Sequence, residues 1–189
     1  MSAHRPPSYP NPYPNRSDFH FSERRGPPAA EYSAGVNRWL LQCNPAVWDI
    51  HACRADGNEG LSEWIVGRHF DDLSVGDPFA LWVGGKQAGV YAVGQLTGEA
   101  RPSPRKKDGD YWKKTPNRDT WVVPLRVDVW LEEPIPKREL ASDPDFAKAT
   151  ILRTPFAANP FRLSFFEWGA IERHLPVARE GAGSDPRSN

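Results

Sequence analysis

The stretch that decides the fold class is Trp121-Val122-Val123-Pro124-Leu125-Arg126-Val127-Asp128-Val129-Trp130-Leu131. Aliphatic residues occupy every second position from Val123 to Leu131, and Arg126, Asp128 and Trp130 lie between them. Because successive side chains of a strand point to opposite faces, this period of two predicts a β-strand with one face in a core.

Further strands are predicted on the N-terminal side of this stretch. Residues 79–83 and 89–96 are apolar, and Gly84-Gly85-Lys86 between them is typical of a hairpin connection. The glycines of the second strand indicate a bulge or close packing at a corner of the sheet. Residues 37–43 form another short apolar strand, which ends at Asn44-Pro45.

Short helices are predicted on the C-terminal side. Residues 164–174 carry apolar residues, including Trp168, at helical spacing and begin with a capping box made by Ser164 and Glu167. Residues 136–149 predict two shorter helices. A few strands crossed by short helices are typical of an α+β domain with a small, strongly curved sheet or barrel.

The two ends of the chain differ in composition from this region. Residues 1–35 contain Pro-Pro-Ser-Tyr-Pro-Asn-Pro-Tyr-Pro and few aliphatic residues, so they bury too little apolar surface to offset their ordering entropy. We expect a disordered Pro-rich tail there; a Pro-rich docking peptide is the alternative. Residues 177–189 are also expected to be a disordered tail, which leaves one domain, residues 36–176.

The formal net charge is +0, which gives no global electrostatic reason for binding a nucleic-acid duplex. The charge is nevertheless uneven, because residues 101–118 contain seven basic and two acidic residues. Tyr111 and Trp112 lie inside this run. The run is typical either of a solvated loop or of a segment that contacts phosphates, and both interpretations stay open.

Cysteine usage and hydropathy bear on the compartment. Cys43 and Cys53 are the 2 cysteines; they make no disulfide framework and are typical of a reducing compartment. No apolar stretch approaches the roughly 18 residues of a membrane span, and no signal peptide is recognisable. We expect a cytoplasmic protein without a membrane partner.

Sequence motifs for catalysis are missing. The histidines and cysteines have no metal-ligand spacing, and no phosphate loop, nucleophile elbow or dinucleotide fingerprint occurs. Two catalytic alternatives are a nucleophilic site of Cys43 with His51 and paired carboxylates at Asp71 and Asp72, which are more simply a solvated turn. We expect no catalytic residue, no metal and no cofactor.

The aromatic residues are the main functional signal. Of the 8 tryptophans, Trp64 and Trp112 lie on polar stretches that resemble loops. A flat aromatic surface held near solvent is costly unless it is used, and stacking on a nucleobase is one common use.

The order and spacing of several segments resemble those of EVE domains. The first segment, Arg38-Trp39-Leu40-Leu41-Gln42-Cys43-Asn44-Pro45, is similar to an opening strand that reads Trp-Leu-(Leu/Met)-Lys-Ser-Glu-Pro in that family. The others are Trp64–Arg68, similar to Trp-x-x-Val-Arg-Asn; Leu73–Phe79, similar to Met-x-x-Gly-Asp; Leu81–Gly94; Trp121–Leu131; and Ser164–Leu175, similar to Ser/Thr-x-x-Glu-Trp. The resemblance covers residues 36–176.

This resemblance implies a PUA-like fold, a small curved β-barrel with short flanking helices, related to that of YTH domains. It also implies an aromatic cage for a modified base, with Trp64 and Trp112 as stacking walls. Trp82 would line its floor, or belong to the ordinary core. The implied base-binding set is Trp64, Trp112, Trp82, Cys43, Asn44 and Ile65, and the implied phosphate-binding set is Arg68, Lys113 and Lys114.

The chain departs from the family pattern at two places. Cys43 stands where the family has Ser, and a thiol is the weaker hydrogen-bond partner. The family's Arg-Asn pair corresponds to Gly67-Arg68 or to Arg68-His69. Both departures concern residues expected near the base.

We therefore expect a non-catalytic nucleic-acid-binding module that reads a methylated or hydroxymethylated base. Its partner would be DNA or RNA that carries this base, with a nuclease or other effector acting in trans as a further candidate. The alternatives are an enzyme acting on a nucleotide or nucleic acid, with Cys43 or Asp71 and Asp72 in its site, and an interaction protein that uses the Pro-rich arm.

Overall fold

The computed structural model describes residues 36–57, 61–104, 111–116, 119–155, 157 and 159–176. Both expected tails, 1–35 and 177–189, lie outside these residues. The strands are β1 (Arg38–Cys43), β2 (Glu63–Val66), β3 (Pro78–Val83), β4 (Gly89–Leu96), β5 (Arg101–Ser103), β6 (Thr120–Pro136) and β7 (Phe161–Leu163). The helices are α1 (Ile50–Ala55), the 3-10 turn η1 (Phe70–Asp72), α2 (Lys137–Ser142), α3 (Thr150–Arg153) and α4 (Phe165–Glu172).

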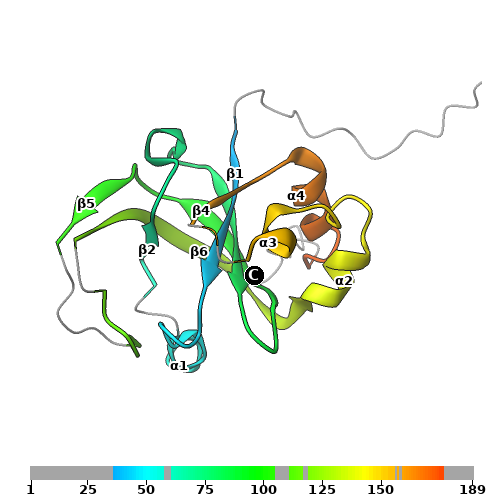
Figure 1. Ribbon diagram of the computed structural model, residues 1–189, viewed down its shortest axis with the longest axis horizontal. Coiled ribbons are helices and arrows are strands. Elements are labelled where there is room, and N and C mark those ends of the chain that lie inside the picture. Colours follow the sequence, from blue (N-terminus) through cyan, green and yellow to red (C-terminus); the bar gives the residue numbers. More distant parts are fainter. Residues whose placement is uncertain are drawn as a thin grey trace, which may run out of the picture. The chain divides into compact units, whose positions relative to one another are not determined.

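These strands form one mixed sheet in the order β2-β6-β4-β3-β1-β7, with β5 paired to β6 beside this path (Figure 1). β1 and β3 are parallel, with Trp39 opposite Phe79, and the other pairs are antiparallel. The register shifts once between β3 and β4 and twice between β4 and β6. Such bulges bend a strand and raise its twist, so they curl the sheet into a half-barrel.

A glycine permits the closest approach in this curl. A Cβ atom on Gly94 would lie 2.0 Å from the backbone oxygen of Arg126 and 2.9 Å from the ring of Phe79. No other residue fits at this position without a shift of backbone, which confirms that a glycine of this strand marks close packing.

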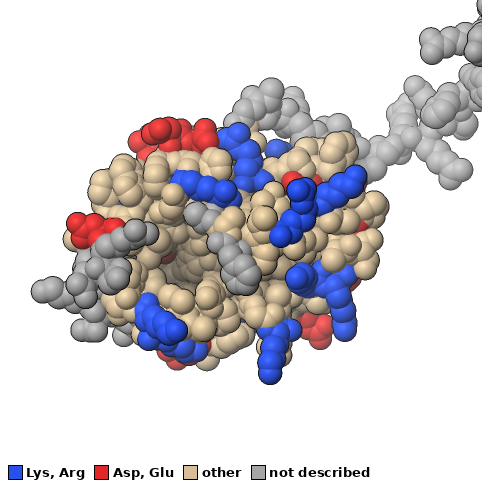
Figure 2. All heavy atoms as spheres, in the orientation of Figure 1, with Lys and Arg blue, Asp and Glu red and all other residues tan. Residues whose placement is uncertain are grey.

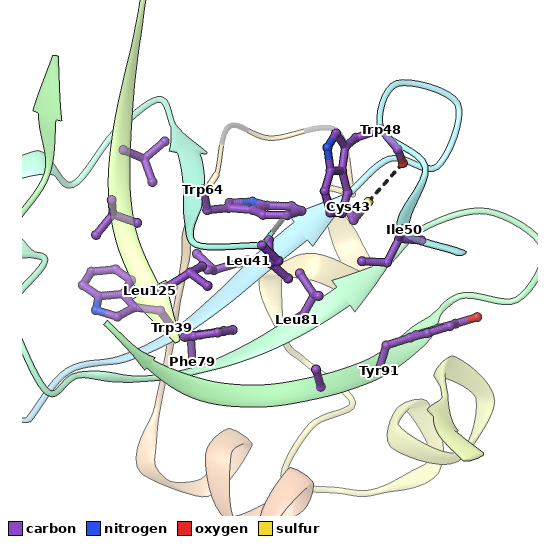
Figure 3. Close-up of a cluster of buried hydrophobic side chains, with 14 of the residues drawn as sticks. Trp39, Leu41, Cys43, Trp48, Ile50, Trp64, Phe79, Leu81, Tyr91 and Leu125 are labelled. Carbon is purple, nitrogen blue, oxygen red and sulfur yellow. Dashed lines mark hydrogen bonds between the residues drawn. The ribbon is translucent and has the colours of Figure 1, made fainter. Parts of the chain in front are cut away.

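Both faces of the sheet are buried, each in its own core. Alternate residues of β1 divide between them: Trp39 and Leu41 join one cluster, and Leu40 joins the other. Figure 3 shows the first cluster, in which Trp39, Leu41, Phe79 and Leu81 lie along β1 and β3. The second contains Phe146, Ile151, Trp168 and Ile171 and so joins the sheet to the helical side of the domain. Because both faces are covered here, the successive residues Trp39–Leu41 of β1 and the residues of β3 are all apolar.

The capping box predicted at the start of α4 is present. Ser164 Oγ accepts a hydrogen bond from the Glu167 N–H at 3.2 Å, and the Ser164 N–H donates to Glu167 Oε2 at 2.6 Å. Trp168 is buried on the inner side of this helix. The predicted fold class, an α+β domain with a small curled sheet and short helices, is confirmed.

Two local expectations were wrong. Trp64 lies on β2, a strand paired to β6, and not on a loop. Residues 101–103, the start of the basic run that is typical of a solvated loop, form β5, which pairs with the start of β6. Arg105–Lys107 and Arg118 of the basic run lie outside the described residues. Within the described part of the chain, no helix has the length and apolarity needed to cross a membrane.

Candidate functional site

A cavity of about 470 Å³ opens between β1, β2 and the segment 111–116. Figure 2 shows a hollow in this face of the domain, in the region where β1, β2 and α1 lie in Figure 1. Its volume lies within the roughly 300–1,000 Å³ that is usual for small-ligand sites. The lining residues are Gln42, Cys43, Asn44, Val47, Trp48, Glu63, Trp64, Ile65, Gly67, Tyr111, Trp112, Pro116, Val122 and Asn159.

Four of the lining side chains are aromatic and come from three separate segments. The rings of Trp48 and Trp64 meet edge to face, with centroids 5.5 Å apart and planes at 84°. Tyr111 meets Trp48 in the same way, at 5.8 Å and 77°. Figure 3 shows the Trp64 ring lying over Leu41 and the Trp48 ring upright beside it. Two perpendicular walls form a corner in which a flat ligand stacks on one ring and touches the other with its edge.

Trp64 is a wall of the core as well as of the cavity. Its side chain is 8% exposed, and on β2 it pairs with Val123 of β6. The expectation that this ring is held near solvent on a loop was therefore wrong. The Trp64 side chain borders the cavity because it lies at the edge of the core: it packs in the buried cluster and also lines the cavity.

The indole N–H groups of Trp48 and Trp64 have no hydrogen-bond partner among the described residues. Within that set the Arg38 Nε is the one side-chain polar atom that is both sealed from solvent and without a partner. The two indole N–H groups therefore reach accessible space, and both residues line the cavity. They provide two donors for the edge of a polar ligand.

The segment 111–116 is held against the start of α1 by backbone and side-chain contacts. The Asp49 N–H donates to the Tyr111 carbonyl at 2.6 Å, and the Lys113 N–H donates to the Val47 carbonyl at 2.9 Å. Lys113 Nζ lies 2.8 Å from Asp49 Oδ2. The hydrogen bond from Lys113, followed by that from the Ala52 N–H, holds the pKa of Asp49 below its ordinary value. These contacts place Tyr111 and Trp112 over the cavity.

Cys43 and Asn44, which we expected at the base edge, both line the cavity, but only Asn44 has an exposed side chain. Cys43 is 1% exposed, its Sγ lies 3.7 Å from the Trp48 carbonyl, and burial raises its pKa to about 12. The Asn44 side chain is exposed, and its Oδ1 accepts from the Ala46 N–H at 3.0 Å. Ile65, from the same expected set, lines the cavity next to Trp64.

Trp82 is not brought into the cavity. It is 2% exposed and stacks on Phe146 in the second core, with centroids 6.4 Å apart and planes at 13°. Successive residues of β3 face opposite sides of the sheet, which puts Trp82 on the face away from Leu81 and the aromatic corner. Of the two roles considered for it, its surroundings are those of an ordinary core residue.

The three expected phosphate contacts lie outside the cavity lining. Arg68 Nε donates to the Pro160 carbonyl at 2.8 Å, and its guanidinium lies 5.0 Å from the centroid of Phe161. Lys113 is engaged with Asp49. Lys114 is exposed, and its ammonium group has no partner among the described residues, so its charge is available to a ligand.

Sequence reasoning missed Trp48, Gln42 and Asn159. The Asn159 side chain accepts from the Gln42 N–H at 2.6 Å and donates to the Gln42 carbonyl at 2.7 Å, across 117 residues of sequence. No local pattern reveals such a contact. Trp48 carried a weak signal, because it is a large aromatic residue in the polar stretch directly after the first strand.

The residues of the catalytic alternatives are not gathered in this cavity. Asp71 and Asp72 lie on η1, where Asp72 Oδ2 is 3.0 Å from His69 Nδ1, and neither lines the cavity. His51 does not line it either. Within the described ranges no group of His, Cys, Asp or Glu side chains is arranged to hold a metal ion.

Comparison with known families decides the relationship of the chain. The model of the EVE domain matches residues 37–174. The chain belongs to the EVE domain family. The match spans the curled sheet and all helices of the described domain, and the expected architecture of a small curled sheet with short flanking helices is confirmed.

Solved structures resemble this EVE domain at low sequence identity. A crystal structure of a protein from Pseudomonas putida is 18% identical with a TM-score of 0.55 and covers 72% of this chain and 97% of that one. A hypothetical protein from Leishmania major is 20% identical with a TM-score of 0.52, covering 73% and 93%. Human THYN1 protein, solved in complex with 5-methylcytosine containing DNA, is 16% identical with a TM-score of 0.49, covering 74% and 99%. No curated protein matches the chain.

Proposed function

We propose that this EVE domain is a non-catalytic nucleic-acid-binding module that takes one modified base into its aromatic cavity. The observation that carries the proposal is the corner of Trp48 and Trp64, closed by Tyr111 and Trp112. Membership of the EVE family supports it, because the sequence resemblance implies base reading for this family. DNA and RNA both offer the required ligand, a planar base with polar edges.

The energetics of such a site suit selective binding of an exposed base. Taking a base out of a duplex costs a few kcal/mol, and stacking on an aromatic side chain returns about 1–3 kcal/mol per base. One methyl group in an apolar pocket changes affinity by about 10–200-fold. We therefore expect moderate affinity, a preference for single-stranded ligands and clear discrimination against the unmodified base.

A role without catalysis agrees with the chemistry of the lining. The nucleophile that the catalytic alternative needs is a thiolate, and burial keeps the Cys43 thiol protonated by raising its pKa to about 12. The cavity offers stacking faces and hydrogen-bond donors but no activated nucleophile among its described residues. These are the properties of a binding site.

The test is a binding panel with matched variants. Short single-stranded DNA and RNA oligonucleotides carry 5-methylcytosine, 5-hydroxymethylcytosine or 6-methyladenine, each with its unmodified twin. Trp112→Ala is the test variant, because Trp112 is half-buried and its loss leaves the core intact. Trp121→Ala is the control: Trp121 is 39% exposed, packs on Phe70 with centroids 4.7 Å apart and does not line the cavity.

We expect a modified-base preference in the wild type and in Trp121→Ala, and its loss in Trp112→Ala. Trp64→Ala is less suitable, because removing a buried Trp costs about 3–5 kcal/mol of stability; Trp64→Phe keeps the apolar volume better and removes the indole N–H. Equal binding of modified and unmodified oligonucleotides by the wild type overturns base reading. An undiminished preference in both Trp112→Ala and Trp64→Phe overturns this location for it.

A further inference from the structure

A second hollow, bordered by α1, the β3–β4 turn and α2, is lined by cations. Arg54, Lys86, Lys137 and Arg138 line this cleft, together with His51 and Tyr91. No Asp or Glu is among its described lining residues. Figure 2 shows blue side chains predominating where the hairpin turn and α2 lie in Figure 1.

The charges of this cationic cleft are not neutralised within the described domain. Arg54 donates to the backbone carbonyls of Leu131 and Glu132, and its guanidinium lies 6.0 Å from the centroid of Trp130. Carbonyl oxygens position the guanidinium without cancelling its charge. Lys86, Lys137 and Arg138 are exposed, and none of them forms an ion pair with a described residue. In a chain of zero net charge, such a local excess favours an anionic ligand.

An intermediate hollow connects the cleft to the aromatic cavity. It shares Gln42, Asn44 and Asn159 with the cavity. It shares Gly85, Ala88 and Lys137 with the cationic cleft. The three depressions therefore follow one another around the hairpin as a groove, aromatic at one end and cationic at the other.

We propose that the phosphate backbone of the strand whose base enters the aromatic cavity runs along this groove into the cationic cleft. This inference rests on the proposed function and names Lys86, Lys137, Arg138 and Arg54 as its phosphate contacts. The cations of the cleft are spread over the β3–β4 turn, α1 and α2. A nucleic-acid strand matches this spacing, because its negative charges repeat along its length. Phosphate contacts of this kind position a strand without reading its sequence.

The experiment compares two double variants with the same loss of charge. Lys86→Ala with Lys137→Ala removes two cations of the groove. Arg126→Ala with Lys148→Ala removes two exposed cations that line none of the three depressions. Each protein is titrated with a single-stranded oligonucleotide that carries the preferred modified base, and with its unmodified twin, at several salt concentrations.

We expect the groove variant to bind both oligonucleotides more weakly by the same factor, so that the modified-to-unmodified ratio is unchanged. Each lost contact to a single strand lowers the logarithmic salt slope by about 0.7, so two contacts account for about a sevenfold affinity change between about 50 and 200 mM salt. The control variant should keep the salt slope of the wild type. A groove variant that behaves like the control overturns the inference.

The ratio of the affinities for the modified and the unmodified oligonucleotide separates this inference from the proposed function. A ratio of one in the wild type overturns base reading, whereas a preserved ratio with an unchanged salt slope in the groove variant overturns the backbone path alone. A calorimetric titration with inorganic phosphate tests whether the cleft instead binds the phosphate of a free small molecule. A saturable phosphate site that is lost in the groove variant without any change in oligonucleotide affinity assigns the cleft to a free phosphorylated molecule and overturns the backbone path.

Discussion

At the scale of single residues, Cys43 shows how burial determines what a side chain does. The thiol lines the cavity at the position where EVE domains have Ser, yet it is 1% exposed and its Sγ lies 3.7 Å from the Trp48 carbonyl. Desolvation is the first cause of its raised pKa, and proximity to Cys53 and Asp49 adds to it. Cys43 is thus a buried thiol whose hydrogen bond goes to the Trp48 carbonyl inside the domain.

We predict that Cys43 reacts with iodoacetamide at pH 8 at least about a thousandfold more slowly in the native protein than in denaturant. The reason is that a pKa raised from 9.0 to about 12 lowers the thiolate fraction by about three decades. Mass spectrometry of the Cys43 peptide measures both rates. Similar rates in the two states would contradict the burial of this thiol and return it to the candidate nucleophiles.

The same pKa shift has a consequence for stability at high pH. The unfolded thiol loses its proton near its ordinary value of 9.0, while the folded thiol keeps it up to about 12. Between these values the native state binds more protons than the unfolded state, so the free energy of unfolding falls as pH rises. This contribution is fully present below pH 9.0 and absent above about pH 12.

The tryptophans show how far the sequence leads at this scale. Trp64, predicted from the sequence as a base-stacking wall, lines the cavity, and that role stays a prediction. Its burial on a strand was not expected, because four residues paired to a distant partner leave no local periodicity. Trp48 was not selected, although it meets both Trp64 and Tyr111. Contacts between three chain segments depend on the curl of the sheet, which a local pattern does not contain.

At the scale of elements, one ion pair adds to the backbone contacts that hold the segment 111–116 over the cavity. Lys113 reaches Asp49, the N-cap residue of α1, and also donates to the Pro45 carbonyl at 3.1 Å. The adjacent Lys114 has an exposed ammonium group without a described partner. A substitution of Lys113 therefore tests the ion pair, and the same substitution of Lys114 is its control.

We predict that Lys113→Met accelerates amide hydrogen exchange at Tyr111–Lys114 by up to about fivefold, because exposed ion pairs stabilise only modestly. The same change should weaken binding of the modified oligonucleotide, since Tyr111 and Trp112 are less well held. Lys114→Met should leave exchange unchanged. Because the pKa of Asp49 is lowered below 3.8, the pair is intact above that pH and is lost as pH falls through the lowered value. Unchanged exchange in Lys113→Met would show that the remaining contacts, to Val47, Asp49 and Asp56, hold the segment without the ion pair.

Elements with strong local signals were predicted and elements without them were not. The β3–β4 hairpin carries a Gly-Gly turn, α4 carries a capping box, and β6 alternates over its central part, so each was found from the sequence. β2 and β5 are four and three residues long and exist because both pair with β6. Their stability is tertiary, and their sequences alone do not distinguish them from loops.

At the scale of the whole domain, β6 joins the two cores. Its first half supplies Val123 and Leu125 to the cluster that borders the aromatic cavity, and its second half supplies Leu131 and Ile135 to the cluster under the helices. One strand of 17 residues therefore belongs to both packing units. We infer that the two cores unfold together, because β6 is a single strand of one sheet and contributes side chains to both cores.

The extent of the core and of the cavity along the sequence predicts which part of the chain is sufficient for folding and ligand binding. The described core residues run from Trp39 to Ile171, and the cavity lining runs from Gln42 to Asn159. We therefore predict that a chain of residues 36–176 unfolds within a few degrees of the full chain and binds the modified oligonucleotide with the same affinity, since every described contact of the core and the cavity is retained. Thermal unfolding and fluorescence titration of the two chains measure this. A shortened chain that keeps its unfolding temperature but loses binding would place part of the ligand site in the terminal residues. If the shortened chain keeps ligand binding but loses association with a protein partner, a chain of residues 36–189 decides whether the Pro-rich residues 1–35 act as the docking peptide, because only that segment is then missing.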